Sequence, residues 1–168
     1  KLPILTDILG QVAEQKVCVW SWHPRVLQWL ARQFPTWNPV QYHGECTDRQ
    51  KDEAMQRFQG DDTCRMFLGN PLSAGISLNL GAGSVGIYWD MNWSWVQYHQ
   101  STQRIDRDLA RTTPLTLYVL LGAGTVEEMC WEAVQNKRDL TNLVVGKNVT
   151  EGFTPTIPRS VFARWRGH

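Results

Sequence analysis

The sequence has almost no net charge and no long hydrophobic run. Its 168 residues include 17 Lys and Arg against 16 Asp and Glu, which gives a formal charge of +1. Domains that hold nucleic acid by bulk charge usually have a pI above about 9, so any nucleic-acid contact of this chain must be local. No stretch approaches the roughly 18 apolar residues of a membrane span, and the first residues do not read as a signal peptide. We therefore expect no membrane partner.

Closely paired cysteines are also missing. Cys18, Cys46, Cys64 and Cys130 lie far apart and form no C-x-x-C pair. This spacing fits reduced thiols better than a zinc site or a disulfide framework. His43 and Cys46 could supply two metal ligands, but nothing completes the four positions that zinc needs. We expect four buried, reduced thiols, no metal site, and a cytoplasmic location in a bacterium or a virus-infected cell, or a nuclear one if the chain is eukaryotic.

Glycine motifs that cradle nucleotides are absent or misplaced. No G-x-x-x-x-G-K-[ST] loop occurs, so the chain has no triphosphate cradle of its own. Residues 81–86 match G-x-G-x-x-G, but they precede a predicted strand instead of following one and opening a helix. We interpret these as ordinary loop glycines, and a dinucleotide-dependent oxidoreductase is a disfavoured alternative.

Helical and strand patterns alternate along the chain. Apolar residues at helical spacing predict a first helix around residues 5–12, followed by helices over 24–34, 47–60, 95–109 and 125–144. Runs of β-branched and aromatic residues predict strands over 16–22, 40–42, 65–69, 84–89 and 115–121. Strands that follow one another through helices pair in parallel with right-handed crossovers. We therefore expect an α/β fold, a parallel β-sheet with helices on both faces, whose ligands bind beyond the carboxyl ends of the strands.

The periodic pattern stops near Gly146. Residues 147–168 contain four Lys and Arg against one Glu and two prolines. Such a segment is typical of a basic extension rather than a second domain. We predict one domain over 1–146 followed by a basic C-terminal extension over 147–168.

The most informative stretch is 100–107. Offsets of four and seven place Gln100, Arg104 and Arg107 on one stripe of a helix, about 140° from an apolar stripe. A solvated charged surface would explain such a stripe. Arginine, however, is a planar, permanently charged, bidentate donor to phosphate, and lysine is not. Two guanidiniums on one exposed face could therefore clamp a γ-phosphate.

Five segments, in order, resemble the C-terminal lobe of superfamily-two helicases, specifically the Swi/Snf-like double-stranded DNA translocases. The resemblance covers about residues 1–146. The segments are 16–23, similar to motif IV, then 43–58, then 73–83, similar to motif V, then 92–107, similar to motif VI, and 124–140, similar to the G-T-i-E-e helix of that family. The resemblance implies a RecA-like fold of the P-loop NTPase type, in which this chain is the second lobe.

The resemblance also implies a function, the second motor lobe of an ATP-dependent DNA translocase or helicase. In that family ATP and Mg²⁺ lie in a cleft between two RecA-like lobes and are held mainly by the N-terminal lobe, which would be the partner of this one. By motif position Arg107 would be the arginine finger, Arg104 a second phosphate ligand, and Gln100 their support. Motif V would link the nucleotide to DNA through Gly75, Ser77 and Asn79. This lobe alone should not hydrolyse ATP.

The resemblance favours double-stranded DNA as the nucleic acid that this chain binds. Its phosphates would be held by backbone N–H groups and hydroxyls at helix N-termini, which carry no sequence information. The capping box that begins at Thr47 predicts such a terminus. The expected contacts are Gly44, Thr47 and Lys51 around it, with Ser21, Trp22 and Asn70 on adjacent loops. The alternative is a non-catalytic RecA-like lobe that docks DNA or a protein.

Overall fold

The computed structural model describes residues 1–73, 78–106 and 114–145, the last eight by their backbone alone. Five strands form one sheet in the order β2-β3-β1-β4-β5, and every neighbouring pair is parallel. The α/β fold and the parallel sheet predicted from the alternating pattern are confirmed. The strands are β1 (Val17–Trp20), β2 (Val40–Tyr42), β3 (Met66–Gly69), β4 (Val85–Tyr88) and β5 (Thr116–Val119).

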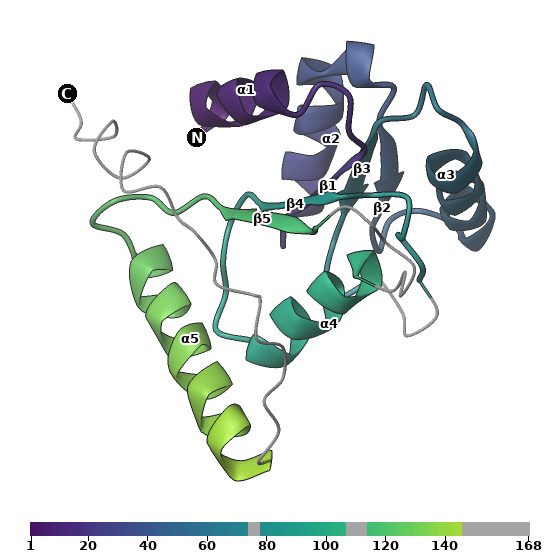
Figure 1. Ribbon diagram of the computed structural model, residues 1–168. Helices are drawn as coiled ribbons and strands as arrows, with labels where there is room; N and C mark the ends of the chain where they lie inside the picture. The colour runs from purple at the N-terminus through teal and green to yellow at the C-terminus, as the bar shows by residue number, and fades with distance from the viewer. Residues whose placement is uncertain (74–77, 107–113, 146–168) are drawn as a thin grey trace.

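Helices cover both faces of the sheet, as Figure 1 shows. Two of them pack their apolar side chains on one face and three on the other, which gives two buried clusters. The first face carries α1 (Leu2–Gln11) and α2 (Pro24–Gln33), and the second carries α3 (Asp48–Gly60), α4 (Trp95–Ile105) and α5 (Val126–Val145). The short 3-10 turn η1 (Pro35–Trp37) leads into β2.

The central strands are buried on both faces. In β1, Val17 and Val19 pack with α1 and α2, whereas Cys18 and Trp20 pack with the opposite cluster. Every residue of β1, β3 and β4 is buried. Continuous apolar runs are expected for parallel strands with helices on both sides, which explains why these runs identified the strands in the sequence.

Helix α3 is fixed at both ends. Its N-cap is Thr47, whose hydroxyl accepts from the Gln50 N–H at 3.3 Å, while the Gln50 side chain accepts from the Thr47 N–H at 2.8 Å. The capping box is therefore present. At the other end, the Lys16 ammonium donates to the carbonyls of Phe58 and Asp61 at 2.7 and 2.9 Å. A cation at this end also complements the helix dipole.

The glycines of the 81–86 motif serve packing. A Cβ on Gly83 would lie 2.9 Å from Cys18 Sγ and 3.3 Å from the Leu80 carbonyl oxygen. A Cβ on Gly86 would collide with Leu117 and lie 3.1 Å from Ile105 Cδ1. Since Gly86 belongs to β4, the motif leads into a strand as predicted, and its glycines allow neighbouring elements to approach closely.

The cysteines differ from the prediction at one position. All four are thiols, and Cys18, Cys64 and Cys130 are buried, but Cys46 is only half-buried because it lies in the loop between β2 and α3. No three His, Cys, Asp or Glu side chains gather as a metal site within the described part of the chain. Across the same residues, no helix combines the length and the apolar character needed to cross a membrane.

Candidate functional site

The loops that follow β1, β3 and β4 are joined at the carboxyl edge of the sheet. The Asp90 carboxylate accepts from the Ser21 hydroxyl at 2.6 Å and from the Trp22 N–H at 2.9 Å. The Asn70 amide donates to the Trp22 carbonyl at 3.0 Å, and its oxygen accepts from the Leu72 N–H at 2.8 Å. Three neighbouring strands thus hold one short loop, 21–23.

Two residues predicted to touch DNA are instead inside this network. Ser21 is fully buried and Asn70 is 4% exposed, so their side chains are not presented to a ligand at the surface. Both side chains hold the loop 21–23 and thereby position Trp22, which is half-buried. Sequence reasoning missed Asp90. Its only signal was an acidic residue directly after a buried strand, at the edge where loops of a parallel sheet meet.

The N-terminus of α3 is accessible. Gly44 and Thr47 are exposed and Lys51 is half-buried, as a contact with a phosphate backbone requires. The Lys51 ammonium lies 3.5 Å from Asp48 Oδ1 and 6.0 Å from the centre of the Tyr42 ring. A Cβ on Gly44 would lie 3.6 Å from Ser73 Oγ, so the loops after β2 and β3 adjoin. All three residues lie at the start of α3 or in the loop before it, and their contact with DNA stays a prediction.

Helix α4 runs back along β4. Ser101 and Thr102 lie against Tyr88 near the carboxyl end of the strand, whereas Ile105 lies against Gly86 nearer its start. A helix that connects parallel strands must return in this way. The end of α4 that carries Arg104 therefore lies toward the amino ends of the strands, not beyond their carboxyl ends as predicted for ligand-binding groups.

The predicted arginine stripe is not uniformly exposed. Gln100 is exposed, but Arg104 is 4% exposed. The segment before β4 packs against this end of the helix, where the Leu80 N–H donates to the Arg104 carbonyl at 2.9 Å. The prediction of an exposed Arg104 guanidinium is therefore wrong, because a helical wheel does not show which distant segment covers a face. Arg107 lies outside the described residues.

Motif V is described only in part. Gly75 and Ser77 lie outside the described residues. Asn79 is exposed, and its side-chain oxygen accepts from the Gly81 N–H at 2.9 Å. Because the next residue, Leu80, bonds to Arg104, the motif V and motif VI segments touch directly. The link between nucleotide and DNA that the resemblance implied for motif V stays a prediction.

A buried tyrosine joins α4 to the sheet. The Tyr88 hydroxyl lies 2.6 Å from Ser101 Oγ, 3.0 Å from Thr102 Oγ1 and 3.1 Å from the Tyr98 carbonyl oxygen. Burial raises the pKa of Tyr88 well above its ordinary value, so the phenol stays protonated. Its ring also packs on Tyr98, with centroids 4.8 Å apart.

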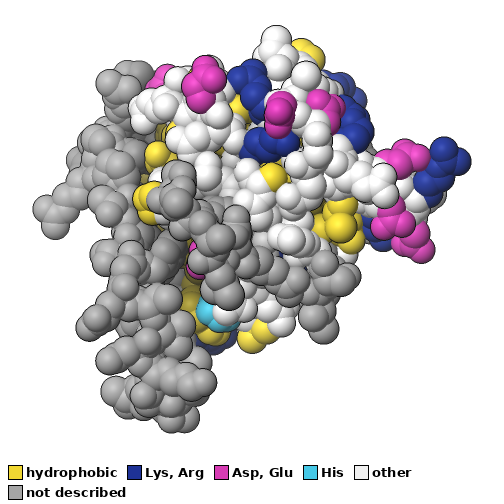
Figure 2. Space-filling model, turned by 45° about the vertical axis from the view of Figure 1, so that its right-hand side comes forward, with side chains coloured by type: hydrophobic (Ala, Val, Ile, Leu, Met, Phe, Trp, Pro, Cys, Tyr) yellow, Lys and Arg dark blue, Asp and Glu magenta, His cyan; other side chains and the backbone are white. Residues whose placement is uncertain are grey.

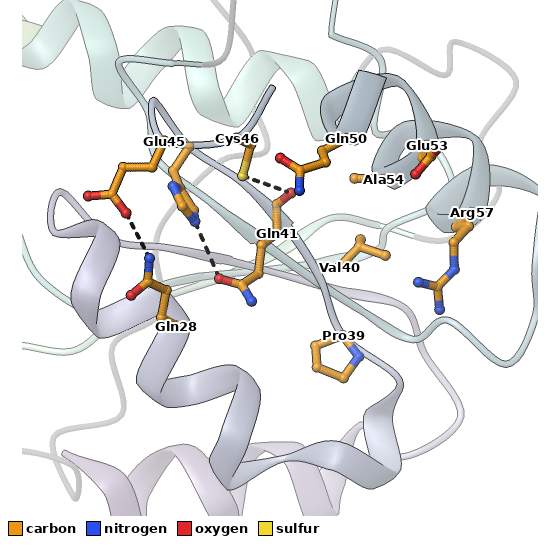
Figure 3. Close-up of a pocket in the computed structure, with 11 residues that line it drawn as sticks. Gln28, Pro39, Val40, Gln41, Glu45, Cys46, Gln50, Glu53, Ala54 and Arg57 are labelled. Atoms are coloured by element: carbon orange, nitrogen blue, oxygen red, sulfur yellow. Dashed lines mark hydrogen bonds between the residues drawn. The ribbon is translucent and has the colours of Figure 1, made fainter. Parts of the chain in front are cut away.

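A groove of about 460 Å³ follows the outer edge of β2, between α2 and α3 (Figure 3). The Gln28 amide donates to Glu45 across it at 2.7 Å. His43, which is 4% exposed, lies in its wall, and burial lowers the pKa of this imidazole. The groove contains none of the predicted site residues. Its lining is Gln28, Pro39, Val40, Gln41, His43, Glu45, Cys46, Gln50, Glu53, Ala54 and Arg57.

Charges of both signs are mixed on the surface. On the face in Figure 2, Lys and Arg side chains alternate with Asp and Glu over the described part. The Arg49 guanidinium, for example, donates to Glu53 at 2.8 Å on the exposed side of α3. Such pairs contribute little to stability. Contacts with nucleic acid would therefore depend on particular loops, as the near-zero net charge predicted.

Comparison with known proteins identifies the class. Residues 1–108 match the family described as the helicase conserved C-terminal domain, and the chain belongs to this family. The proteins and structures to which it is similar are of the SNF2 type, as the five segments predicted. It is 30% identical over 152 residues to the CHD3-type chromatin-remodeling factor CHR7 of Arabidopsis thaliana, which covers 88% of this chain and 13% of that protein.

Other similar proteins agree. The human SWI/SNF-related matrix-associated actin-dependent regulator of chromatin subfamily A member 1 is 24% identical over 151 residues, covering 86% of this chain and 14% of that protein. The C-terminal part of the Fun30 ATPase domain superposes with a TM-score of 0.71 at 18% identity, covering 79% of this chain and 44% of that one. The Sulfolobus solfataricus SWI2/SNF2 ATPase C-terminal domain superposes with a TM-score of 0.58 at 16% identity, covering 85% of this chain and 57% of that one.

Proposed function

We propose that this chain is the second motor lobe of an ATP-dependent DNA translocase or chromatin remodeller. The match of residues 1–108 to the helicase C-terminal family carries the proposal, because it spans motifs IV to VI. The direct bond between the segments of motifs V and VI supports it. The lobe would work with an N-terminal RecA-like lobe in the same parent protein, closing on ATP and opening after hydrolysis.

ATP and Mg²⁺ would be held mainly by the partner lobe. This chain has no phosphate loop. We assign Mg²⁺ to the other side of the cleft because the resemblance implies that the N-terminal lobe holds it. The contribution of this chain would be positive charge. Negative charge spreads over the γ-phosphate oxygens during transfer, and an arginine finger placed there is worth about 10³–10⁵ in rate.

Arg107 is the residue we assign as that finger. Burial of Arg104 changes its proposed part, since a guanidinium covered by its own lobe supports the local structure rather than reaching a nucleotide. Gln100, which is exposed on α4 and stands seven positions before Arg107 in the sequence, keeps its proposed supporting role. We keep Gly75, Ser77 and Asn79 as the proposed connection between the nucleotide and the DNA.

The DNA contact we propose is the N-terminus of α3 and the loop beside it. Gly44, Thr47 and Lys51 would bind phosphates directly, because Gly44 and Thr47 are exposed and Lys51, which is half-buried, follows Thr47 in the first turn of α3. Ser21 and Asn70 would act through Trp22, whose loop they fix. Phosphate contacts of this kind position a duplex without reading its sequence.

An alanine at Arg107 tests the proposal in the full-length protein. Arg107→Ala should lower DNA-stimulated ATP hydrolysis by about 10³-fold or more while DNA affinity stays nearly unchanged. Arg32→Ala, at an exposed arginine on α2, is the matched control and should leave both properties unchanged. Unchanged ATP turnover in Arg107→Ala, with DNA binding retained, would reject the motor and leave a docking lobe.

A further inference from the structure

Strand β4 supports α4 with two residues on one face. Gly86 and Tyr88 alternate with Ile87, which points to the opposite cluster. The missing side chain of Gly86 lets Ile105 approach the strand, since a Cβ there would lie 3.1 Å from Ile105 Cδ1. One turn earlier in the helix, the Tyr88 hydroxyl meets Ser101 and Thr102. Gly86 therefore sets how closely α4 lies on the sheet.

The Tyr88 hydroxyl fixes the rotation of α4 and its position along β4, which close packing alone does not define. Apolar contacts let a helix slide or rotate by small amounts, whereas hydrogen bonds at 2.6 and 3.0 Å to two consecutive residues define its rotation and its position along the strand. Ser101 is fully buried, and its hydroxyl also bonds within the helix to the Gln97 carbonyl at 2.8 Å. The phenol is thus tied to a rigid part of α4.

The constrained turn immediately precedes the last turn of α4, which carries Arg104. Thr102 is followed by Arg104, which is buried and bonded through its carbonyl to Leu80. In the sequence Arg107 follows α4 by two residues. A small change in rotation or position of α4 would therefore be passed to Arg104 and to its bond with the motif V segment.

We propose that Tyr88 is a positioning residue for ATP hydrolysis, which fixes helix α4 through its hydroxyl and thereby sets the place of Arg104 and of its bond with the motif V segment. The proposal rests on the function proposed above. It assigns Tyr88 no contact with nucleotide or DNA. Misplacement of a catalytic group by about 1 Å can cost on the order of 100-fold in rate, so a single buried hydroxyl is able to matter.

The variant Tyr88→Phe in the full-length protein separates positioning from packing. Phenylalanine keeps the ring contact with Tyr98 and removes only the hydroxyl. We expect kcat for DNA-stimulated ATP hydrolysis to fall about tenfold, with KM for ATP and the Kd for duplex DNA within about twofold of wild type. A finger acts in the transition state, and its displacement therefore lowers kcat.

Ile87→Val is the matched control for stability. It removes one methyl group from the same strand, on the face that α4 does not touch, and should lower the thermal midpoint by a similar small amount. We expect its kcat to equal that of wild type. If Tyr88→Phe keeps the wild-type kcat, or if Ile87→Val loses as much kcat as Tyr88→Phe, Tyr88 has no positioning role.

Thr102 offers a rescue by a conservative change. Thr102→Val removes the hydroxyl at nearly constant volume and should lower kcat in the same direction as Tyr88→Phe. Thr102→Ser keeps the hydroxyl, so its kcat should equal that of wild type and exceed that of Thr102→Val. Equal kcat values for the two Thr102 variants would overturn the inference.

Arg107→Ala, measured beside these variants, distinguishes failure of the proposed function from failure of the inference about Tyr88. If Arg107→Ala abolishes turnover and Tyr88→Phe has no effect, only the inference about Tyr88 fails. If Arg107→Ala leaves turnover unchanged, the proposed function fails and the inference fails with it. Loss of kcat in both variants, with DNA binding retained, supports both.

Discussion

The Ser21 hydroxyl donates to the Asp90 carboxylate at 2.6 Å, although the two residues lie 69 positions apart in the sequence. Ser21 follows β1 and Asp90 follows β4, and these strands are neighbours in the sheet. The bond therefore joins the ends of two adjacent strands. The second carboxylate oxygen accepts from Trp22, so one acidic side chain holds two consecutive residues of the loop that we assign to DNA.

Removing this carboxylate should loosen the loop. Asp90→Ala leaves the buried Ser21 hydroxyl and the Trp22 N–H without their acceptor, at a cost of about 2 kcal/mol in the free energy of unfolding. Duplex DNA affinity of the full-length protein should fall as well, because the loop is no longer held. Urea unfolding and a DNA titration check the two effects. Wild-type DNA affinity in Asp90→Ala would count against the assigned role of this loop.

Lys51 should contribute to DNA binding through charge alone. Lys51→Gln is expected to weaken binding equally for different DNA sequences and to reduce the slope of log affinity against log salt by about 1. Arg32→Gln, on α2, should leave the slope unchanged. DNA titrations at several salt concentrations measure both. An unaltered slope in Lys51→Gln would remove this lysine from the contact.

Stability should depend on pH through His43. Burial lowers the pKa of this imidazole, opposed by Glu45 and aided by Lys51. The unfolded chain therefore binds a proton more readily than the folded one, and stability falls as pH drops from the ordinary value of 6.5 toward the lowered value. Urea midpoints near pH 5 and pH 7.5 should differ less in His43→Gln than in wild type. Parallel pH profiles would show that His43 makes no contribution.

Two glycine substitutions should act in opposite directions. Gly86→Ala places a Cβ against Leu117 and Ile105 and should destabilise the chain by about 1–3 kcal/mol. Gly10→Ala lies near the end of α1 with nothing within 4 Å of the new Cβ, and should stabilise by roughly 0.5–1 kcal/mol. Thermal unfolding of the two variants checks both signs. A stabilising Gly86→Ala would mean that the sheet can move to accommodate it.

Local patterns were sufficient for most of the fold. The strand predicted over 40–42 coincides with β2, and the capping box at Thr47 marks the start of α3. Both features depend on residues close in the sequence. The parallel pairing of the strands followed from the alternation of strands and helices, because such strands pair in parallel with right-handed crossovers.

Long-range contacts were not predictable in the same way. Arg104 resembles an exposed cation on a helical wheel, yet Leu80 covers the end of its helix from the segment before β4. Asp90 has partners that stand 68 and 69 positions away, so no local pattern marks it. Ser21 and Asn70 lie on loops as expected for DNA contacts, although the strand predicted over 16–22 ends earlier, at Trp20, and their burial depends on partners distant in the sequence.

The sheet order also bears on how such a lobe would carry load. Strand β1 lies between β3 and β4, so the strands leading to the two proposed sites share one hydrogen-bonded layer. In the function proposed above, a pull of DNA on α3 would pass through the paired strands β3, β1 and β4, the last of which bonds to α4 through Tyr88. Movement at one of the two proposed sites would thus be transmitted to the other through the sheet.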